Sequence, residues 1–428
     1  MADQTGKELR NKLIYQIFVR NYSEEGTFDG VKKDLVRIRD LGTDIVYLLP
    51  IHPIGEKCRK GSLGSPYAIS DYRAVNPEYG TLEDFRSLVD AIHDLGMKCM
   101  IDVVYNHTSP DSVLVKEHPE WFYRKADGSF GNHVGDWSDI IDLDYSIPGL
   151  AEYQIETLRY WAGIVDGFRC DVAPLLPITF WERARREVAE VNPDCIWLSE
   201  SVEHEFIKIL RSSGIPVHSD CEMYRAFDIL YDYDIYGACT DYLFGNGTLS
   251  DYVAAINRQE TTYPDNYVKL RFLENHDQTR AHFLIPDEKA LRSFTVFSFF
   301  QKGTAFLYAG QEFGVSHLPS LFDRDTVRMQ PEEGIDMTGL IKRLMEIKKD
   351  MIFTDSTYTV TESGPDIVTA VHEKGDDLAV GVFSLKGRTA LAKVPLTDGI
   401  YTNLLTGENI EVFREHIRCS GEPVIIRK

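Results

Sequence analysis

The chain has 428 residues, of which 43% are hydrophobic and 26% charged, a balance typical of globular proteins with a sizeable core and not of disordered chains. Acidic residues outnumber basic ones by 67 − 46 = 21, and such a negative field repels nucleic-acid backbones and anionic membrane surfaces. We therefore expect neither a nucleic acid nor a membrane as a partner.

Residues 1–12 are polar and charged, without the apolar run of ~7 to 15 residues found in secretory signals. No apolar stretch of the sequence approaches the ~18 residues of a bilayer span. The seven cysteines are odd in number and lack CxxC spacing, which argues against a disulfide framework and a zinc ribbon. These features favour a cytoplasmic protein with reduced thiols.

The first two hundred residues repeat one unit, an amphipathic helix closed by glycine and followed by a short apolar strand. Residues 31–41 place their apolar side chains on one helical face, Gly42 is expected to end that helix, and a strand follows at 45–49. The next helix is expected to end at Gly96, before a continuous apolar strand at 99–104. This alternation predicts an α/β fold.

Eight apolar segments in all are candidates for strands of one parallel sheet. They are residues 14–19, 45–49, 99–104, 167–169, 195–198, 217–219, 270–273 and 304–308. Eight strands separated by helical patterns indicate a (β/α)₈ TIM barrel, in which functional residues lie at the C-terminal ends of the strands. An open doubly wound sheet is the competing topology.

Two regions depart from the repeat. Residues 108–145 are rich in Gly, Asp and aromatic residues and exceed an ordinary βα connection, which we interpret as a small inserted domain after the third strand. Residues 354–428 show short alternating strands with turn signals and predict a C-terminal antiparallel β-sandwich. The barrel would then comprise residues 1–107 and 146–353.

Polar residues follow the predicted strands where the mouth of the barrel would lie, whereas motifs of nucleotide, phosphate-loop, zinc-protease and serine-hydrolase sites are absent. They are Asp102 and Asn106-His107 after the third strand, Arg169 and Asp171 after the fourth, Glu200 after the fifth and His276-Asp277 after the seventh. A spacing of two puts Arg169 and Asp171 on one face, so that the guanidinium would hold the carboxylate ionised. Any single acid could be solvated surface, but the joint pattern indicates a carboxylate active site.

At these residues the sequence resembles the alpha-amylase family of glycoside hydrolases, family thirteen, and especially its small intracellular bacterial members. The four central motifs of that family occur in order, with flanking similarity over residues 13–314. They read Asp102-Val-Val-Tyr-Asn-His107, Gly167-Phe-Arg-Cys-Asp171, Trp197-Leu-Ser-Glu200 and Phe272-Leu-Glu-Asn-His-Asp277.

The resemblance implies a division of work among three acids. Asp171 is similar to the nucleophile that forms a covalent glycosyl-enzyme, and Glu200 to the acid that protonates the departing oxygen and then activates water. Asp277 is similar to the third acid, which binds sugar hydroxyls in the distorted transition state. The residues implied to bind substrate are Tyr67, Asp102, His107, Arg169 and His276.

No cofactor is expected for the chemistry itself. In many family members, residues like Asn106 and Asp142 hold a structural calcium ion through hard oxygen ligands. The Lys-His pair that contributes to that site in relatives is replaced here by Pro174-Leu175. The sequence thus leaves a structural calcium at Asn106 and Asp142 as an open expectation.

The form Asp142-Leu-Asp144 resembles alpha-amylases more than the α-1,6-cleaving relatives. We therefore expect a retaining hydrolase of α-1,4-glucosidic bonds in maltodextrins or starch-derived oligosaccharides. Within the family, the alternatives are an α-glucan transglycosylase, a phosphorylase or an α-1,6-glucosidase. The alternative of another class is a non-catalytic carbohydrate-binding or assembly subunit, which the presence of all three acids disfavours.

Overall fold

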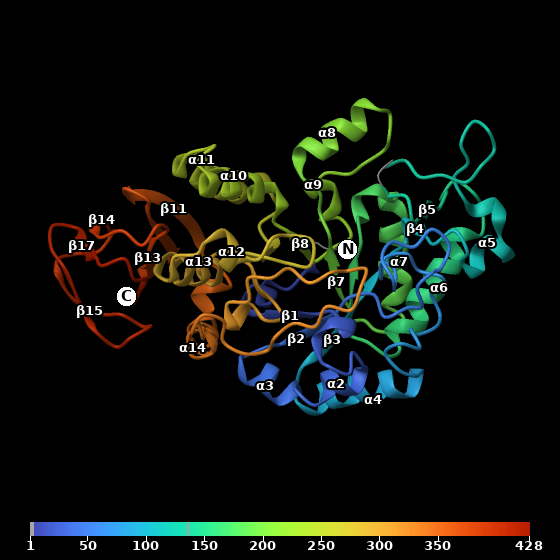
Figure 1. The fold of residues 1–428 in the computed structure, drawn as a ribbon. Coiled ribbons are helices and arrows are strands. Elements are labelled where there is room, and N and C mark those ends of the chain that lie inside the picture. The colour runs from blue at the N-terminus through green and yellow to red at the C-terminus, as the bar shows by residue number, and fades with distance from the viewer. Residues whose placement is uncertain (1–3, 135–136) are drawn as a thin grey trace.

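The computed structural model describes residues 4–134 and 137–428, and its centre is a closed barrel of eight parallel strands (Figure 1). Around the barrel the order is β1 (Leu13–Ile17), β10 (Thr304–Tyr308), β9 (Val268–Arg271), β8 (Ile229–Tyr231), β7 (Ile196–Ser199), β6 (Gly167–Cys170), β3 (Lys98–Val103) and β2 (Ile45–Leu48). Because β1 pairs with both β2 and β10, the sheet closes on itself. The (β/α)₈ barrel is confirmed, and the open doubly wound sheet is wrong.

Helices surround the barrel, and one of them, α8, stands away from it at the top of the view (Figure 1). They are α1 (Val19–Tyr22), α2 (Phe28–Lys32), α3 (Leu35–Asp40), α4 (Leu82–Asp94), α6 (Leu150–Ala162), α7 (Ile178–Val188), α8 (His204–Ser212), α9 (Asp220–Met223), α10 (Tyr233–Phe244), α11 (Leu249–Thr262), α12 (Ala281–Leu284), α13 (Glu288–Phe300) and α14 (Thr338–Lys348). Short 3₁₀ turns are η2 (Lys7–Asn11), η4 (Ala173–Leu175), η5 (Gln311–Phe313) and η6 (Met351–Phe353).

Helix α4 shows how the local sequence fixes these boundaries. Thr81 and Asp84 form a reciprocal capping box at its start, and the side chains of Phe85 and Leu88 are fully buried against the barrel. Gly96 adopts the left-handed conformation with φ 77° just after the helix, as predicted from its position before the strand.

Two predicted elements are corrected by the structure. Residues 217–219 form no strand: Val217 packs with Ile207 of α8, and Ser219 caps α9 through a capping box. The sixth barrel strand is β8, whose apolar run of three residues is too short to stand out in the sequence. The predicted helix 31–41 is divided into α2 and α3.

The segment after β3 extends from one side of the barrel. It contains a two-stranded antiparallel sheet of β4 (His107–Thr108) and β5 (Ile141–Asp142), together with α5 (Val113–Glu117) and the 3₁₀ turn η3 (Pro119–Trp121). We call residues 108–145 the insert; residues 135–136 of this range, like residues 1–3 of the predicted barrel range, lie outside the described residues. Figure 1 shows the insert and the C-terminal strands on opposite sides of the barrel.

The C-terminal region is antiparallel, as the change of sequence period predicts. One sheet has the order β11 (Thr357–Gly364), β12 (Ile367–Lys374), β13 (Asp377–Ser384) and β18 (Val424–Arg427), and two-stranded sheets pair β14 (Ala390–Lys393) with β17 (His416–Cys419) and β15 (Gly399–Thr402) with β16 (Asn409–Val412). This region contacts the barrel through α13, where the rings of Phe300 and Phe383 lie 5.4 Å apart. The predicted C-terminal β domain is confirmed.

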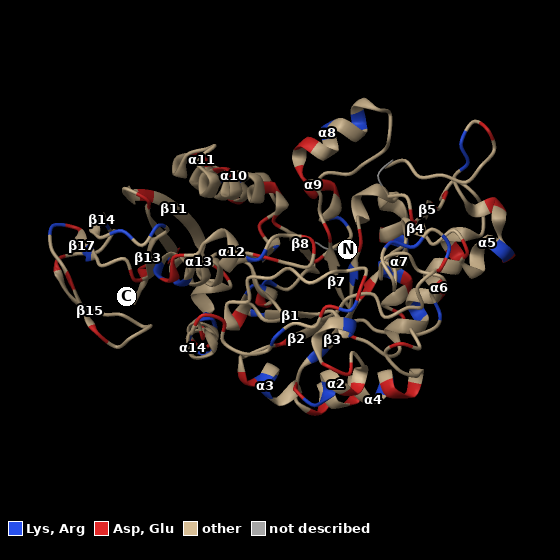
Figure 2. Ribbon diagram, in the orientation of Figure 1, with Lys and Arg blue, Asp and Glu red and all other residues tan. Residues whose placement is uncertain are grey.

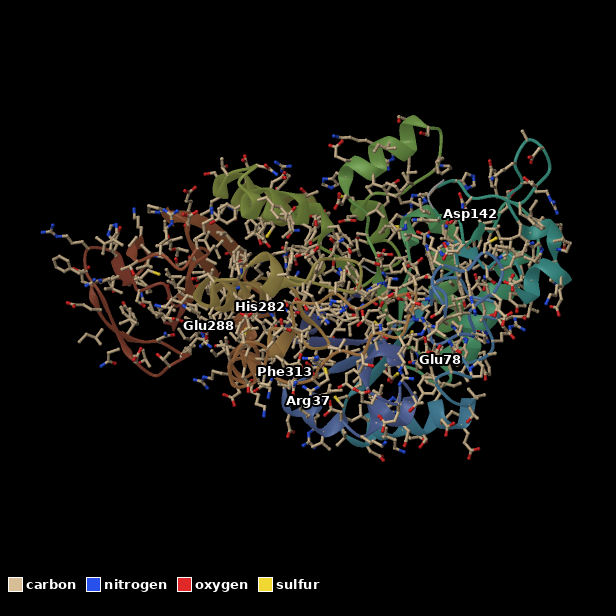
Figure 3. The ribbon with its side chains drawn as sticks, viewed as in Figure 1. Arg37, Glu78, Asp142, His282, Glu288 and Phe313 are labelled. Atoms are coloured by element: carbon tan, nitrogen blue, oxygen red, sulfur yellow. The ribbon has the colours of Figure 1, made fainter. Side chains whose placement is uncertain are left out.

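The first and last barrel strands, β1 and β10, are linked by a polar cluster around the buried carboxylate of Glu312. Glu312, just after β10, accepts hydrogen bonds from the hydroxyl of Tyr15 (2.7 Å) and from Nη1 of Arg37 (2.6 Å). The guanidinium of Arg37 lies over the ring of Phe313, at 5.3 Å from its centroid (Figure 3). One cluster therefore ties β1, α3 and the end of β10 together.

Basic and acidic residues are interspersed along the outer helices α2, α3 and α4 (Figure 2). Such a mixed surface is the ordinary solvent-facing layer of a globular protein. In the part of the chain that the structure describes, no helix combines the length and the apolar character needed to cross a bilayer.

Candidate active site

A single arginine gathers three acidic side chains at the C-terminal end of the barrel. Arg169 in β6 is fully buried, and its Nη1 lies 2.9 Å from Oδ1 of Asp102 and 2.9 Å from Oδ1 of Asp171. Its Nη2 lies 2.7 Å from Oε1 of Glu200, just after β7. The predicted juxtaposition of Arg169 and Asp171 is thus present in the structure, and three carboxyl groups compete for one guanidinium.

Aromatic and amide side chains complete the floor of this cluster. Oδ2 of Asp102 accepts hydrogen bonds from the hydroxyls of Tyr47 in β2 (2.6 Å) and Tyr67 (2.9 Å). The hydroxyl of Tyr67 also bonds to Nε2 of His276, and the two rings stack with centroids 5.4 Å apart. Gln16 in β1 holds the other ring nitrogen of His276 at 2.9 Å. Side chains from β1, β2, β3 and β6 and from the loops that follow several strands therefore converge on one mouth.

Asp277 lies on the loop that follows β9, with a carboxylate oxygen 3.0 Å from Nε2 of His276. Its side chain is 41% exposed, unlike those of Asp171 (9%) and Glu200 (10%). An accessible acid beside two buried ones suits contact with hydroxyl groups of an incoming ligand.

The loop of Asp277 is closed by a second buried ion pair. Glu274 and Arg280 are fully buried and joined through Nη1 of the guanidinium, and Oε2 of Glu274 also accepts the backbone N–H of Ala281 (2.6 Å). Arg280 further donates to the carbonyls of Ala309 (3.0 Å) and His317 (3.2 Å). Because the ion pair joins residues 274 and 280, it closes the loop between them and restrains the backbone that carries Asp277.

Burial and mutual repulsion shift the protonation equilibria of the carboxyl groups. Burial and then the charge of Glu200 raise the pKa of Asp171, while Arg169 acts in the opposite direction. Burial also raises the pKa of Glu200. Although burial opposes it, the neighbouring His276 lowers the pKa of Asp277 below its usual range. The cluster can therefore carry a proton on one acid while another is ionised, as acid–base chemistry requires.

The backbone after Asp171 is strained. Val172 has φ 35° and ψ 39°, the left-handed region that β-branched residues rarely adopt. In this conformation its N–H donates to Oε2 of Glu200 at 2.8 Å. The strained turn thus contributes directly to holding the acid in place.

Three predicted residues lie beside this cluster, at the base of the insert. His107 is buried in β4 with its ring 5.6 Å from that of Trp137, and burial lowers its pKa to about 4. Asn106 and Asp142 are neighbours, with Nδ2 and Oδ1 3.4 Å apart; Figure 3 labels Asp142 in this region. Over residues 4–134 and 137–428, no three His, Cys, Asp or Glu side chains are placed to hold a metal ion.

Sequence reasoning did not single out four members of the site region. Tyr47 and Gln16 are hidden in apolar strands, where only their inward-facing position, every second residue along the strand, distinguishes them. Glu274 and Arg280 flank Asp277 symmetrically at three residues on each side, and this spacing is a signal that could have been used.

An eight-stranded barrel with acids gathered at the C-terminal ends of its strands is the arrangement of (β/α)₈-barrel enzymes that use carboxylates. The chain matches the model of the alpha amylase catalytic domain over residues 13–127 and 115–359, and that of the bacterial alpha amylase C-terminal domain over residues 359–426. It therefore belongs to the alpha-amylase family, as the motif resemblance predicts.

Two solved structures are similar along the whole chain. An alpha-amylase from Lactobacillus plantarum is 50% identical with a TM-score of 0.96, covering 99% of this chain and 100% of that one. A noncanonic maltogenic alpha-amylase, AmyB, from Thermotoga neapolitana is 33% identical with a TM-score of 0.87, covering 98% and 99%.

Curated relatives are similar over a smaller part. An alpha-1,4-glucan:maltose-1-phosphate maltosyltransferase from Salinibacter ruber is 36% identical over 216 residues, which are 44% of this chain and 32% of that protein. The alpha-amylase MalA from Haloarcula japonica is 28% identical over 316 residues, 71% of this chain and 44% of that protein. The chain thus spans less than half the length of these curated relatives.

Proposed function

We propose that this protein is a retaining glycoside hydrolase that cleaves α-1,4-glucosidic bonds in maltodextrins and starch-derived oligosaccharides. The observation that carries the proposal is the shared contact of Asp171 and Glu200 with one guanidinium at the barrel mouth. Retaining enzymes hold their two carboxyl groups about 5 to 5.5 Å apart, closer than inverting enzymes do, and one Arg169 reaching both supports retention.

The proposed roles follow from the environment of each acid. Arg169 engages Oδ1 of Asp171, which leaves the second oxygen to attack the anomeric carbon and form a glycosyl-enzyme. The family motif assigns Glu200 as the acid that protonates the departing oxygen and later removes a proton from water, and a raised pKa, which it shares with Asp171, is compatible with that role. Asp277, which is ionised and accessible, would bind sugar hydroxyls most strongly in the distorted transition state.

Substrate binding is proposed for the polar rim around these acids. Tyr67 is partly exposed, stacks on the buried ring of His276 and hydrogen-bonds Asp102, so its ring can serve as a platform for the apolar face of a glucosyl ring. Arg169 would act mainly by orienting the acids, and His107 would line the side of the mouth toward the insert.

The choice of the α-1,4 bond and of hydrolysis is supported by relatives. The Lactobacillus protein is described as an alpha-amylase and the Thermotoga protein as a maltogenic one, and both match this chain from end to end. These likenesses favour short maltooligosaccharide products.

The test is time-resolved proton NMR of the full chain with maltoheptaose, with Asp171→Asn as the control. We expect shorter products that appear first as α-anomers, and no turnover by the variant. Early β-anomers would contradict retention. Absence of cleavage of every α-1,4-glucan would contradict the proposed substrate, and the same assay on isomaltooligosaccharides would test the α-1,6 alternative.

A second candidate is maltosyl transfer, because the Salinibacter relative is a maltosyltransferase that uses maltose 1-phosphate. Transfer passes through the same covalent intermediate, with a sugar instead of water as the acceptor. Incubation with maltose 1-phosphate and maltohexaose distinguishes the two: release of inorganic phosphate with chain elongation favours the transferase, and chain shortening alone favours the hydrolase.

A further inference from the structure

The contact between the insert and the barrel is organised around one carboxylate, Asp142 in β5. Its Oδ2 accepts the backbone N–H of His133 at 2.7 Å and Nδ1 of the same imidazole at 2.8 Å. Its Oδ1 faces Nδ2 of Asn106 at 3.4 Å. The carboxylate side chain is only 5% exposed, and among the described residues its side-chain oxygens are hydrogen-bonded by these N–H groups.

These surroundings do not fit the calcium ion that the family resemblance implies for Asn106 and Asp142. Calcium takes six to eight oxygen ligands at about 2.3 to 2.6 Å, whereas the groups that face Asp142 are nitrogen donors. Nδ2 of Asn106 also lies 3.2 Å from Nδ1 of His107. The firmest part of this arrangement is at Oδ2 of Asp142, which the backbone N–H and the imidazole of His133 both occupy.

The backbone of the insert is built to carry this contact. The N–H of Asp142 donates to the carbonyl of Gly131 (2.9 Å), and its own carbonyl accepts from Tyr123 (3.0 Å). The imidazole of His133 lies against the ring of Tyr123, with centroids 4.0 Å apart. Three segments of the insert thus meet at Asp142. Asp142 also pairs with His107 in the two-stranded sheet of β4 and β5.

We infer that the side chain of His133 replaces a structural calcium ion in this protein: it holds Asp142 in place within the insert, and Asp142 in turn contacts Asn106 and pairs with His107 at the base of the insert. An imidazole N–H and a backbone N–H give the buried carboxylate the hydrogen bonds that it needs. The insert would then hold its place without any metal, and activity and stability would be indifferent to chelators. This inference concerns the architecture of the insert and does not depend on the proposed function.

The first experiment compares the thermal unfolding and metal content of the full chain before and after treatment with EDTA. We expect far less than one calcium ion per chain by elemental analysis and a change in Tm below about 1 °C, whether EDTA or millimolar CaCl₂ is added. About one calcium per chain retained through gel filtration, or a Tm that falls with EDTA and recovers with calcium, would overturn the inference.

The second experiment removes the imidazole. His133→Ala should lower Tm by about 2 °C or more and accelerate proteolytic cleavage within the insert. The matched control is His93→Ala, because Nε2 of His93 lies 2.7 Å from Asp166 and its side chain is 41% exposed, against 40% for His133. The control should leave cleavage of the insert unchanged. Equal behaviour of the two variants would contradict the inference.

A third variant tests whether a cation can take the place of the His133 side chain. His133→Asp places a second carboxylate beside Asp142, and this pair should bind a cation that the wild-type chain does not need. We expect its Tm to be lower than that of the wild type without metal and to rise by several degrees, about 3 °C or more, in millimolar CaCl₂. If His133→Ala does not fold, His133→Gln, which keeps an N–H donor, should fold. The role of His133 would be rejected if His133→Asp responded to calcium as the wild type does and the insert of His133→Ala were cleaved at the wild-type rate.

Discussion

Two buried ionic clusters lie at the same end of the barrel, and their charge balance differs. Arg169 faces three carboxyl groups, those of Asp102, Asp171 and Glu200. Arg280 pairs with one, that of Glu274, and also donates to the backbone carbonyls of His317 and Ala309. The first cluster places three carboxyl groups around one buried guanidinium, and the second pairs one carboxyl group with one guanidinium.

The difference separates a site that performs chemistry from one that supports it. Buried carboxylates that lie close together repel one another, which lowers the free energy of unfolding and raises their pKa values. The raised pKa values of Asp171 and Glu200 are the reactive property that this arrangement provides. A matched pair contributes no such reactivity, and removing one partner leaves the other uncompensated. Replacing a carboxylate by an amide should therefore reduce mainly activity in the first cluster and mainly the free energy of unfolding in the second.

The largest effect is expected for Asp171→Asn. Loss of the nucleophile should lower kcat by about 10⁴-fold or more. Because the substitution removes a negative charge beside Glu200, the free energy of unfolding should stay the same or increase. Steady-state kinetics on maltoheptaose and chemical denaturation measure the two quantities. A variant that retains most of its activity would show that another group attacks the sugar.

The matched substitution in the balanced cluster is Glu274→Gln. It leaves the buried guanidinium of Arg280 without a counter-charge, and we expect the free energy of unfolding to fall by about 3 kcal/mol. Activity of the folded fraction should fall far less than in Asp171→Asn, with the change mainly in KM, because Asp277 keeps its carboxylate on a looser loop. Urea denaturation beside kinetics on the same samples measures both, and a stability equal to that of Asp171→Asn would remove the distinction between the clusters.

A pH profile of Asp102→Asn sharpens the comparison further. The charge of Asp102 raises the pKa of Asp171, so its removal should lower that pKa and let the nucleophile stay ionised in more acidic solution. The acid limb of kcat/KM against pH should then move to lower pH, while the limb set by protonated Glu200, where activity disappears as pH rises, should move less. An acid limb that shifts upward would mean that Asp102 acts on Asp171 in the opposite direction.

The smallest effect concerns the strained turn at Val172. Val172→Gly relieves the left-handed conformation and should raise the free energy of unfolding by up to about 1 kcal/mol. Val172→Ala is the control, because it removes the same methyl groups and keeps a Cβ in the strained region. Thermal unfolding of the two variants separates strain from packing: a gain with alanine as large as with glycine would assign the effect to the side chain.

Much of the architecture could be predicted from the sequence, since apolar strands, glycine stops and capping residues are local signals. Gly42 and Gly96 have left-handed φ angles of 93° and 77°, as their positions before strands require. The sixth strand could not be recognised, because β8 has three residues and its identity depends on parallel pairing with β7 and β9. Val217 matched the apolar pattern equally well and is used instead to cover α8.

The acids at the mouth could be predicted because each lies at or just after the end of a barrel strand. The C-terminal ends of the strands lie together in the barrel, so position in the sequence is enough to place these acids near one another. Tyr47, which hydrogen-bonds Asp102 across the barrel, could not be found, because its neighbour lies 55 residues away and no local pattern links them. The same reason hides His133, whose partner Asp142 is reached only after the insert folds back on itself.

The pairing of β1 with β10 has a consequence for biosynthesis. β1 is complete at residue 17, and its second neighbour begins at residue 304, so at roughly 5 to 20 residues per second the ribosome needs on the order of 15 to 60 s to supply it. During that interval one backbone edge of an apolar strand is unpaired. The nascent chain must shield this edge until translation is nearly finished, and final ring closure at Tyr15, Arg37 and Glu312 becomes a late step in maturation of the protein.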